Sequence, residues 1–429
     1  MTSTATAPPN TGIGVPSSAP APASLGRSGM ANQPNAATSA IPFTRGSTDA
    51  TMKDNAQALV FASSQSVQIQ LQTNAFLAAL IIEFTTVAAG NSATVVYTPD
   101  APYNYITLIR LDDPAGQGII SPITGYQLYL LNKYLPDTGC RFDPASDPNF
   151  NLVAGTATTG GSFSFRLILP VEHRHRDAFG AVNNSAANQR YLITLTTGAS
   201  TAVYSTAPTT VPTNVNVSIY QQYWTSPPAT ITTSQGSSQV QQSPAGLGTV
   251  AFVRYERHNE VSGGGTPQIQ LNNVGDYISS LIFVLRNSSN QRDGTTGLTA
   301  QPVAAAGDWP TEFDWWVNDF QVHALNVGDW QRNMAKVYGY RSAMGPSASG
   351  VATTTPNTNA NALDIGVFVL FQLDGLFDVV ENYAPANQYL PTDSTTKLQI
   401  RGSTFGSGAS YLEVITRMIR PVSGAALFN

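Results

Sequence analysis

Charged side chains are scarce in this 429-residue chain: Asp, Glu, Lys and Arg together make up 11% of it, where soluble domains usually carry about a quarter. Lysine is scarcer still, with only four of the 21 basic residues. Arginine is favoured at protein interfaces, whereas lysine is depleted there. The deficit predicts that much of the outer surface contacts other protein, as in an assembly.

Basic clusters are missing as well. The formal net charge is −5, and no Lys/Arg-rich block occurs anywhere in the sequence. Proteins that hold nucleic acid through its phosphates need such clusters. Direct binding to nucleic acid is therefore not expected.

Cysteine, long apolar runs and common catalytic motifs are also lacking. The single cysteine, Cys140, excludes an internal disulfide framework and a multi-thiolate metal site. No run of 18 apolar residues could span a bilayer, and the N-terminus lacks the features of a signal peptide. GxSxG, phosphate-binding glycine-loop, HExxH and calcium-loop patterns are absent. Gly263–Gly265 is interpreted as a flexible connection.

The feature that is present is an internal repeat. Asn74–Phe84 is echoed by Gly275–Leu285, at an offset of 201 residues. Later landmarks keep nearly the same spacing: Gly125–Tyr134 with Asp329–Tyr338 and Phe163–Leu169 with Val367–Leu373 at 204, Leu192 with Leu398 at 206, and Ile219 with Val414 at 195. Five landmarks in one order predict a duplicated domain of roughly 200 residues.

Three segments follow from this repeat. Residues 1–60 are rich in Ala, Pro, Ser, Thr, Asn and Gly and are predicted to form a flexible N-terminal arm, because they bury too little apolar surface to offset ordering. The arm could instead order against a neighbouring subunit. Residues 61–245 form the first predicted domain and residues 246–429 the second.

Strand patterns dominate both halves. Val67, Ile69 and Leu71 alternate with glutamines, as in a half-buried strand, and Phe76–Thr86 is apolar on both faces, as in a central strand. Each half has one expected helix. Ser121 and Pro122 are predicted to start the first, which Pro136 would stop, and Asp329 and Gly339 are expected to bound the second.

A long polar loop follows each expected helix, at Asp137–Gly161 and Ser342–Asn361, and the second half adds Asn287–Asp308. Loops of this length are usually functional. The predicted fold class is all-β: two tandem β-sandwiches, each with one short helix and long loops.

Histidines offer a weak case for a metal site. His173 and His175 form a His-x-His pair next to Glu172, and the only others are His258 and His323. Zinc would need one or two further ligands beyond the pair. The preferred interpretation is a polar loop that follows a strand ending at Pro170, so no metal site is predicted.

Two acidic pairs could in principle support glycoside hydrolysis. Asp112 and Asp113 precede Pro114 and Gly116, which is typical of a turn. Glu312 and Asp314 precede Trp315 and Trp316, which resemble a sugar-binding platform, although aromatics in a sandwich usually belong to the core. No catalytic residue and no cofactor-binding residue is predicted, and the chain is not expected to be an enzyme.

The order of these features resembles the double jelly-roll major capsid proteins of the tectivirus and adenovirus lineage, above all those of tailless, membrane-containing bacteriophages. The segments that carry the resemblance are Phe76–Phe84, Thr94–Ile106, Ile109–Pro114, Phe165–Glu172 and Asn188–Leu195. The likeness covers roughly residues 67–420 and rests on strand patterns.

This resemblance implies a viral major capsid protein that assembles as pseudo-hexagonal homotrimers in an icosahedral shell and is located in the virion after synthesis in the host cytoplasm. The implied partners are other copies of the chain, penton and minor capsid proteins, and an internal viral membrane reached by the N-terminal arm. Two alternatives stay open: a two-roll glycan-acting amidase or glycosidase, and a minor capsid or receptor-binding spike protein of the same lineage.

Overall fold

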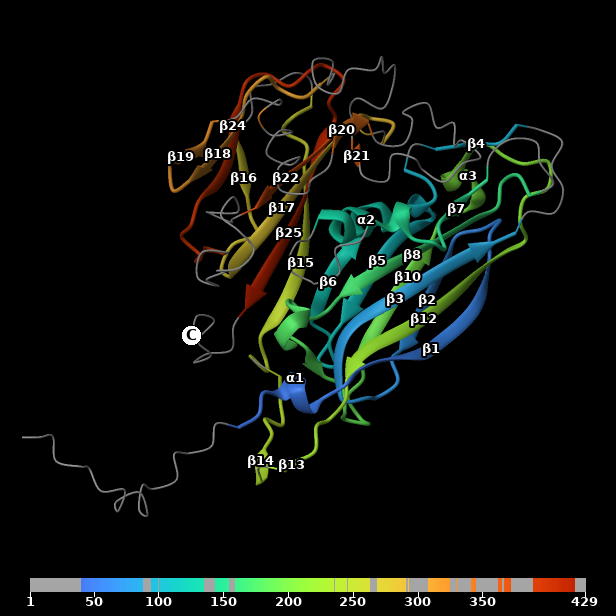
Figure 1. Cartoon of the computed structure of the whole chain (residues 1–429). Coiled ribbons are helices and arrows are strands. Elements are labelled where there is room, and N and C mark those ends of the chain that lie inside the picture. Colours follow the sequence, from blue (N-terminus) through green and yellow to red (C-terminus); the bar gives the residue numbers. More distant parts are fainter. Residues whose placement is uncertain are drawn as a thin grey trace, which may run out of the picture. The chain divides into compact units, whose positions relative to one another are not determined.

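A computed structural model gives the structure of residues 40–87, 94–98, 100–134, 143–153, 159–234, 236–244, 246–262, 268–290, 292, 308–324, 329, 341–344, 362–364, 366–371 and 389–420. Ile41–Asn429 forms one compact unit, and β-strands dominate it (Figure 1).

The first half contains two four-stranded antiparallel layers, which together make the first roll. One layer has the order β1 (Asp49–Val60), β12 (Asn214–Trp224), β3 (Phe76–Thr86) and β8 (Phe163–Pro170), with β7 (Asn151–Leu152) beyond β8 and β9 (Val182–Asn183) beside β3. The other has the order β2 (Gln65–Gln70), β10 (Leu192–Thr197), β5 (Ile106–Asp112) and β6 (Gly118–Ile123). Alternating burial along β12 fits a strand with one face in a core.

The second half repeats both layers and makes the second roll. One layer has the order β15 (Val250–His258), β25 (Tyr411–Arg420), β17 (Tyr277–Arg286) and β22 (Val367–Phe371), with β23 (Leu390–Pro391) also on β17. The other has the order β16 (Ile269–Leu271), β24 (Leu398–Gly402), β18 (Phe313–Val317) and β19 (Phe320–His323). Figure 1 shows β15, β25 and β17 running side by side.

Strand order is the same in the two rolls, which confirms the predicted duplication of the fold. In chain order the strands of the first roll correspond one to one with those of the second: β1 with β15, β2 with β16, β3 with β17, β5 with β18, β6 with β19, β8 with β22, β10 with β24 and β12 with β25. Both rolls also have a β-bulge at the same place. The pairing of β3 with β12 skips Ala78, and the pairing of β17 with β25 skips Ser279. These positions are again 201 residues apart.

Short elements complete the described structure. They are α1 (Phe43–Gly46), η2 (Tyr103–Tyr105), α2 (Gly125–Tyr134), η3 (Pro144–Ser146), η4 (His175–Asp177), α3 (Ser200–Val203), the pair β4 (Val96–Tyr97) and β11 (Tyr204–Thr206), the pair β13 (Thr230–Thr233) and β14 (Gly236–Gln239), and the pair β20 (Arg341–Met344) and β21 (Ala362–Leu363).

Helix α2 confirms the expected helix in the first half, but its predicted start is wrong. Ser121 and Pro122 belong to strand β6. Thr124 is the actual N-cap: the Gln127 amide donates to Thr124 Oγ1 over 3.2 Å, and the Thr124 amide donates to Gln127 Oε1 over 2.9 Å. This reciprocal pair is a capping box. The counterpart expected at Asp329–Tyr338 lies outside the described residues.

The predicted arm, residues 1–60, ends earlier in the structure, because Asp49–Val60 is strand β1 and pairs with β12 along its length. Only its Leu59 is buried. The sequence pattern missed β1 because its partly buried positions hold small or polar residues such as Ala50 and Gln57. The division between the rolls at residues 245 and 246 stays a prediction.

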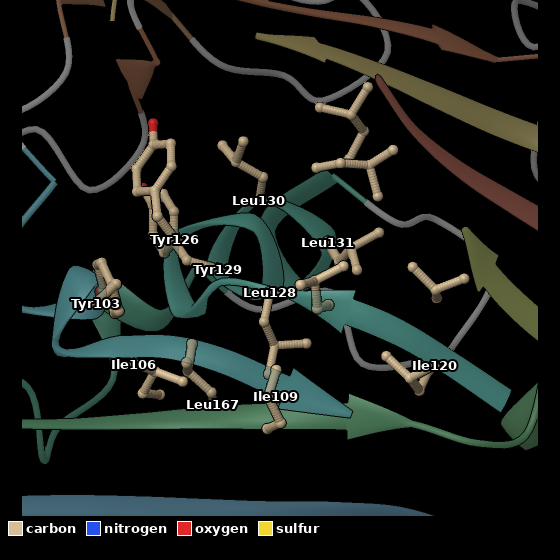
Figure 2. Packing of buried hydrophobic residues seen from close by; sticks show 14 of the residues in the cluster. Tyr103, Ile106, Ile109, Ile120, Tyr126, Leu128, Tyr129, Leu130, Leu131 and Leu167 are labelled. Carbon is tan, nitrogen blue, oxygen red and sulfur yellow. The ribbon is translucent and has the colours of Figure 1, made fainter. Parts of the chain in front are cut away.

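One hydrophobic cluster extends through both rolls. It includes Leu80 of β3 and Leu281 of β17, which occupy equivalent positions in the two rolls and are both fully buried. Figure 2 shows α2 on top of the first roll, with Leu128 directed at Ile109 and Leu167. Since burial of apolar surface is the main stabilising contribution to folding, the shared cluster supports both rolls at once.

Candidate functional site: the junction between the two rolls

The histidine pair lies where the two rolls meet. His173 is buried, and its Nε2 lies 2.5 Å from the Tyr389 hydroxyl. Arg417 of β25 donates through Nη2 to the Glu172 carbonyl oxygen over 3.2 Å and lies 3.3 Å from His173 Nδ1. Burial, with the Arg417 and Arg174 charges beside it, holds the pKa of His173 well below its usual range. His173 is therefore a neutral side chain that links the first roll to the second.

His175 has different surroundings, so the pair does not form a joint metal site. Its Nδ1 contacts the Glu172 carboxylate, and its Nε2 lies 3.4 Å from Asp49 Oδ2 at the start of β1. The hydrogen bond to Glu172 raises the pKa of His175. Glu172 also accepts a 3.0 Å hydrogen bond from Trp224 Nε1. His175 and Glu172 thus hold the beginning of β1 within the first roll.

The other two histidines lie elsewhere. His258 is buried at the end of β15, with Nε2 at 3.3 Å from Glu256 and Nδ1 at 3.6 Å from Glu260. His323 ends β19 opposite Trp315. Among the residues that the structure describes, no group of three or more His, Cys, Asp or Glu side chains could hold a metal ion.

Asp113 stabilises a turn, and Asp112 ends strand β5 just before it. Arg110 Nε donates to Asp112 Oδ1 over 2.6 Å. Asp113 Oδ1 accepts hydrogen bonds from the amides of Ala115 at 2.9 Å and Gln117 at 2.7 Å, and Gly116 adopts a φ of +83°. This is the side-chain-stabilised turn that the composition indicated.

Glu312 and Asp314 do not frame an aromatic platform. Trp315 is 1% exposed and belongs to the core, together with Phe313 on the same face of β18. The Trp316 ring lies on the other face, and the Arg401 guanidinium covers it, with the guanidinium carbon 4.2 Å from the ring centroid. The sugar-platform interpretation of the tryptophans is therefore wrong for Trp315.

Other positions singled out in the sequence lie outside the described residues, wholly or in part. Cys140 and Gly263–Gly265 are wholly outside. The long loops are described only at residues 143–153 and 159–161, at 342–344, and at 287–290, 292 and 308.

Backbone pairing joins the rolls directly. Strand β6 of the first roll lies parallel to β15 of the second, with Ile120 opposite Val253, and links their layers into one nine-stranded sheet. Arg254 of β15 donates through Nη1 to the Gly118 carbonyl oxygen over 2.9 Å. Ile120 and Val253 are 0% and 2% exposed. We call this β6–β15 contact the intrachain seam.

A buried charge cluster joins helix α2 to the second roll. Lys133 Nζ lies 2.9 Å from Asp364 Oδ2 and 3.5 Å from Asp143 Oδ2, and the side chains of all three are almost wholly buried. The Tyr134 hydroxyl donates to Asp364 Oδ2 over 2.8 Å and accepts from the Asp364 amide over 2.9 Å. Burial raises the pKa of Asp143 to about 6, against the opposing effect of Lys133.

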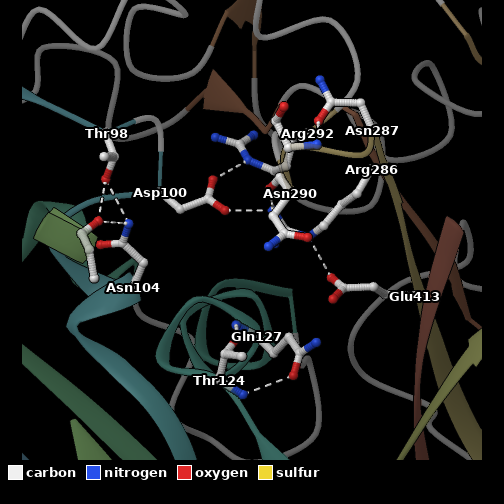
Figure 3. A network of polar contacts seen from close by, with 12 residues as sticks. Thr98, Asp100, Asn104, Thr124, Gln127, Arg286, Asn287, Asn290, Arg292 and Glu413 are labelled. Atoms are coloured by element: carbon white, nitrogen blue, oxygen red, sulfur yellow. Dashed lines mark hydrogen bonds and ion pairs between the residues drawn. The ribbon is translucent and has the colours of Figure 1, made fainter. Parts of the chain in front are cut away.

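A second buried cluster spans the same junction (Figure 3). Asp100 of the first roll accepts from Arg286 Nη1 at 2.7 Å and from Arg292 Nε at 2.6 Å. Arg286 also donates through Nε to Glu413 of β25 over 2.8 Å. Burial alone would raise the pKa of Asp100, but the two guanidinium groups lower it below its usual value. Paired buried charges of this kind fix one arrangement, because separating them leaves an uncompensated charge.

Sequence reasoning missed these junction residues. The available signal was weak: Lys133 is one of only four lysines in the chain and stands in a helix that is mostly apolar and aromatic. Its partner Asp364 is more than 200 positions away, so no local pattern could pair them.

No helix in the described part of the chain has both the length and the apolar character needed to cross a membrane.

Comparison with known proteins yields structural likeness only. No protein-family model and no curated protein matches the sequence. The crystal structure of the STIV MCP is similar at a TM-score of 0.56 and 11% identity, over 87% of this chain and 96% of that chain. A structure of Sulfolobus Turreted Icosahedral Virus gives 0.56 and 12%, over 86% and 90%. The PBCV-1 virus capsid gives 0.51 and 10%, over 87% and 93%. The likeness spans both rolls, and with the repeated strand order it establishes a double jelly-roll fold for this chain.

Proposed function

We propose that this chain is a viral major capsid protein that assembles as homotrimers of pseudo-hexagonal outline in an icosahedral shell. The observation that carries the proposal is the fold: two rolls of identical strand order, similar along most of their length to the coat structures of two viruses. Three chains with two similar rolls each supply six similar units around a ring.

The rigid junction supports this role. A six-unit capsomer needs a fixed angle between the two rolls of each chain, since an error in that angle would accumulate around the ring. The intrachain seam, the shared hydrophobic cluster and the two buried charge clusters all hold that angle. Low charge content also suits a chain whose flanks are covered by neighbours.

The remaining expectations belong to the same proposal. The chain would be located in the virion after synthesis in the host cytoplasm and would contact penton and minor capsid proteins. The N-terminal residues would face an internal viral membrane, as in membrane-containing bacteriophages. The net charge of −5 supports a coat without direct contact to nucleic acid.

Electron microscopy of the purified protein and of particles tests the proposal. We expect single capsomers with a six-lobed outline, and a copy number in particles that makes this chain the most abundant shell component. A few copies per particle would contradict the proposal and favour a minor capsid or spike protein. Turnover of a glycan substrate by the purified chain would favour the enzymatic alternative.

A further inference from the structure

Each of the two strands that form the intrachain seam has a counterpart elsewhere in the chain. Because the rolls repeat each other, β19 of the second roll corresponds to β6, and β1 of the first roll corresponds to β15. The seam joins β6 to β15, so the same contact made once more would join a β19 to a β1.

Strand register places the counterparts residue by residue. On the β6 side, each edge strand skips one residue at the same place: Leu111 pairs with Ile120 and Asp112 with Gly118, while Trp315 pairs with His323 and Trp316 with Gln321. Leu111 and Trp315 both belong to the core. His323 therefore stands where Ile120 stands.

The β15 side is fixed by the shared bulge. Val253 pairs with Arg417, which pairs with Ser280 just after the bulge. Thr51 pairs with Gln222, which pairs with Ala79 just after the equivalent bulge. Thr51 therefore stands where Val253 stands.

Both counterpart edges are open in the part of the chain that the structure describes. There β19 pairs only with β18, and β1 pairs only with β12. Thr51 is exposed and His323 is only half-buried, whereas Ile120 and Val253 are buried. Phe320 and Val322 of β19 are 77% and 49% exposed, which is unusual for large apolar side chains on an edge strand.

We propose that β19 of one chain adds in parallel to β1 of a second copy, with His323 opposite Thr51, and so repeats the intrachain seam between chains. The two edges differ, so the contact is head to tail, and contacts of this kind generate rings when the rotation closes. Closure after three chains rests on the proposed function. The pairing of the two edges rests on the repeated register.

Engineered disulfides test the pairing. In a Cys140→Ser background, the double variant Thr51→Cys/His323→Cys is oxidised and compared with each single variant. Neighbouring strands lie about 4.8 Å apart, which suits a disulfide between directly opposed positions. We expect covalently linked dimers and trimers from the double variant and monomers from each single variant. A matched control, Thr51→Cys/Val87→Cys, uses another exposed position and should stay uncrosslinked.

The outcomes separate the two proposals. A wild-type trimer whose double variant does not crosslink would overturn the β19–β1 pairing and leave the capsomer intact. Dimers from the His323→Cys variant alone would indicate that two β19 strands meet, which also overturns it. A wild-type chain that is monomeric at every concentration would overturn both proposals.

A charge on β19 provides a second test that does not depend on disulfide chemistry. Phe320→Asp should raise the concentration at which half of the protein is trimeric by about tenfold or more, because it removes an apolar side chain from the contact. Val87→Asp changes an equally apolar, 71% exposed residue and should leave assembly unchanged. Circular dichroism verifies that both variants fold. Equal assembly of the two variants would contradict the inference.

Discussion

The β6 and β19 strands occupy the same place in their rolls and have opposite surroundings. Ile120 of β6 is fully buried beneath β15, whereas Phe320 of β19 is 77% exposed. The fold of the roll does not account for this difference, because strand order is identical in both. Burial of this edge is decided by the neighbour that covers it, and the second roll has no such neighbour among the described residues.

Ion pairs at the junction and on the outer surface of the second roll differ in the same way. Lys133 of the first roll pairs with Asp364 with side chains 1% exposed, whereas Lys397 of the second pairs with Asp319 with side chains 59% and 57% exposed. Exposed pairs contribute little to stability, and breaking a buried pair is costly. The junction is thus held by charges that water cannot replace.

The largest expected effect tests whether the rolls are equivalent in their cores. Leu80→Ala and Leu281→Ala truncate fully buried counterparts in β3 and β17. Each should lower the free energy of unfolding by about 3 to 5 kcal/mol. Chemical denaturation measures both. A loss below about 1 kcal/mol in one variant would show that the two cores are not equivalent.

The next effect concerns the buried ion pair. Asp364→Ala removes the nearer of the two carboxylates that face the buried Lys133 ammonium. We expect a loss of about 3 kcal/mol in the free energy of unfolding, measured by chemical denaturation. An unchanged midpoint would show that the cluster does not hold the junction.

A pH effect follows from Asp143, whose pKa is raised to about 6, compared with about 3.9 in an unfolded chain. The folded state therefore binds this proton more tightly, and the contribution of Asp143 to stability falls as pH rises from about 4 to about 6. Asp143→Asn should lack this fall, so its stability relative to the wild type should increase across that range. Thermal unfolding of both proteins at a series of pH values measures this increase. Curves of stability against pH that run parallel for the two proteins would contradict the raised pKa of Asp143.

The smallest expected effect sharpens the contrast between buried and exposed pairs. Lys397→Met removes the exposed partner of Asp319, which keeps Arg401 at 2.9 Å. The free energy of unfolding should change by less than about 1 kcal/mol. A loss as large as that of Asp364→Ala would remove the distinction on which the account of the junction depends.

Much of the fold could be predicted from sequence, because apolar periodicity records which face of a strand is buried. The β3, β8 and β12 strands and the 201-residue offset were all visible in this way. The β1 strand was missed, because an edge strand with Ala50 and Thr51 carries little apolar pattern. The predicted helix start was wrong because Ser121 and Pro122 continue β6, which pairs with β5 on both sides of them, at Ile120 and Ile123.

The junction could not be predicted from sequence. Asp100 and Arg286 are 186 positions apart, and Lys133 and Asp364 still farther. Ion pairs between such positions leave no periodic signal, and only the tertiary fold brings them together. The exposure of Phe320 could not be predicted from sequence either, since an aromatic residue on a strand is usually assigned to the core.

The native mass of the purified chain, measured by light scattering coupled to size exclusion, tests the central claim most directly. Assembly through β19 and β1 into a closed capsomer predicts about 136 kDa, three times the 45.4 kDa chain. A mass near 45.4 kDa at all concentrations would contradict both the capsomer and the edge pairing.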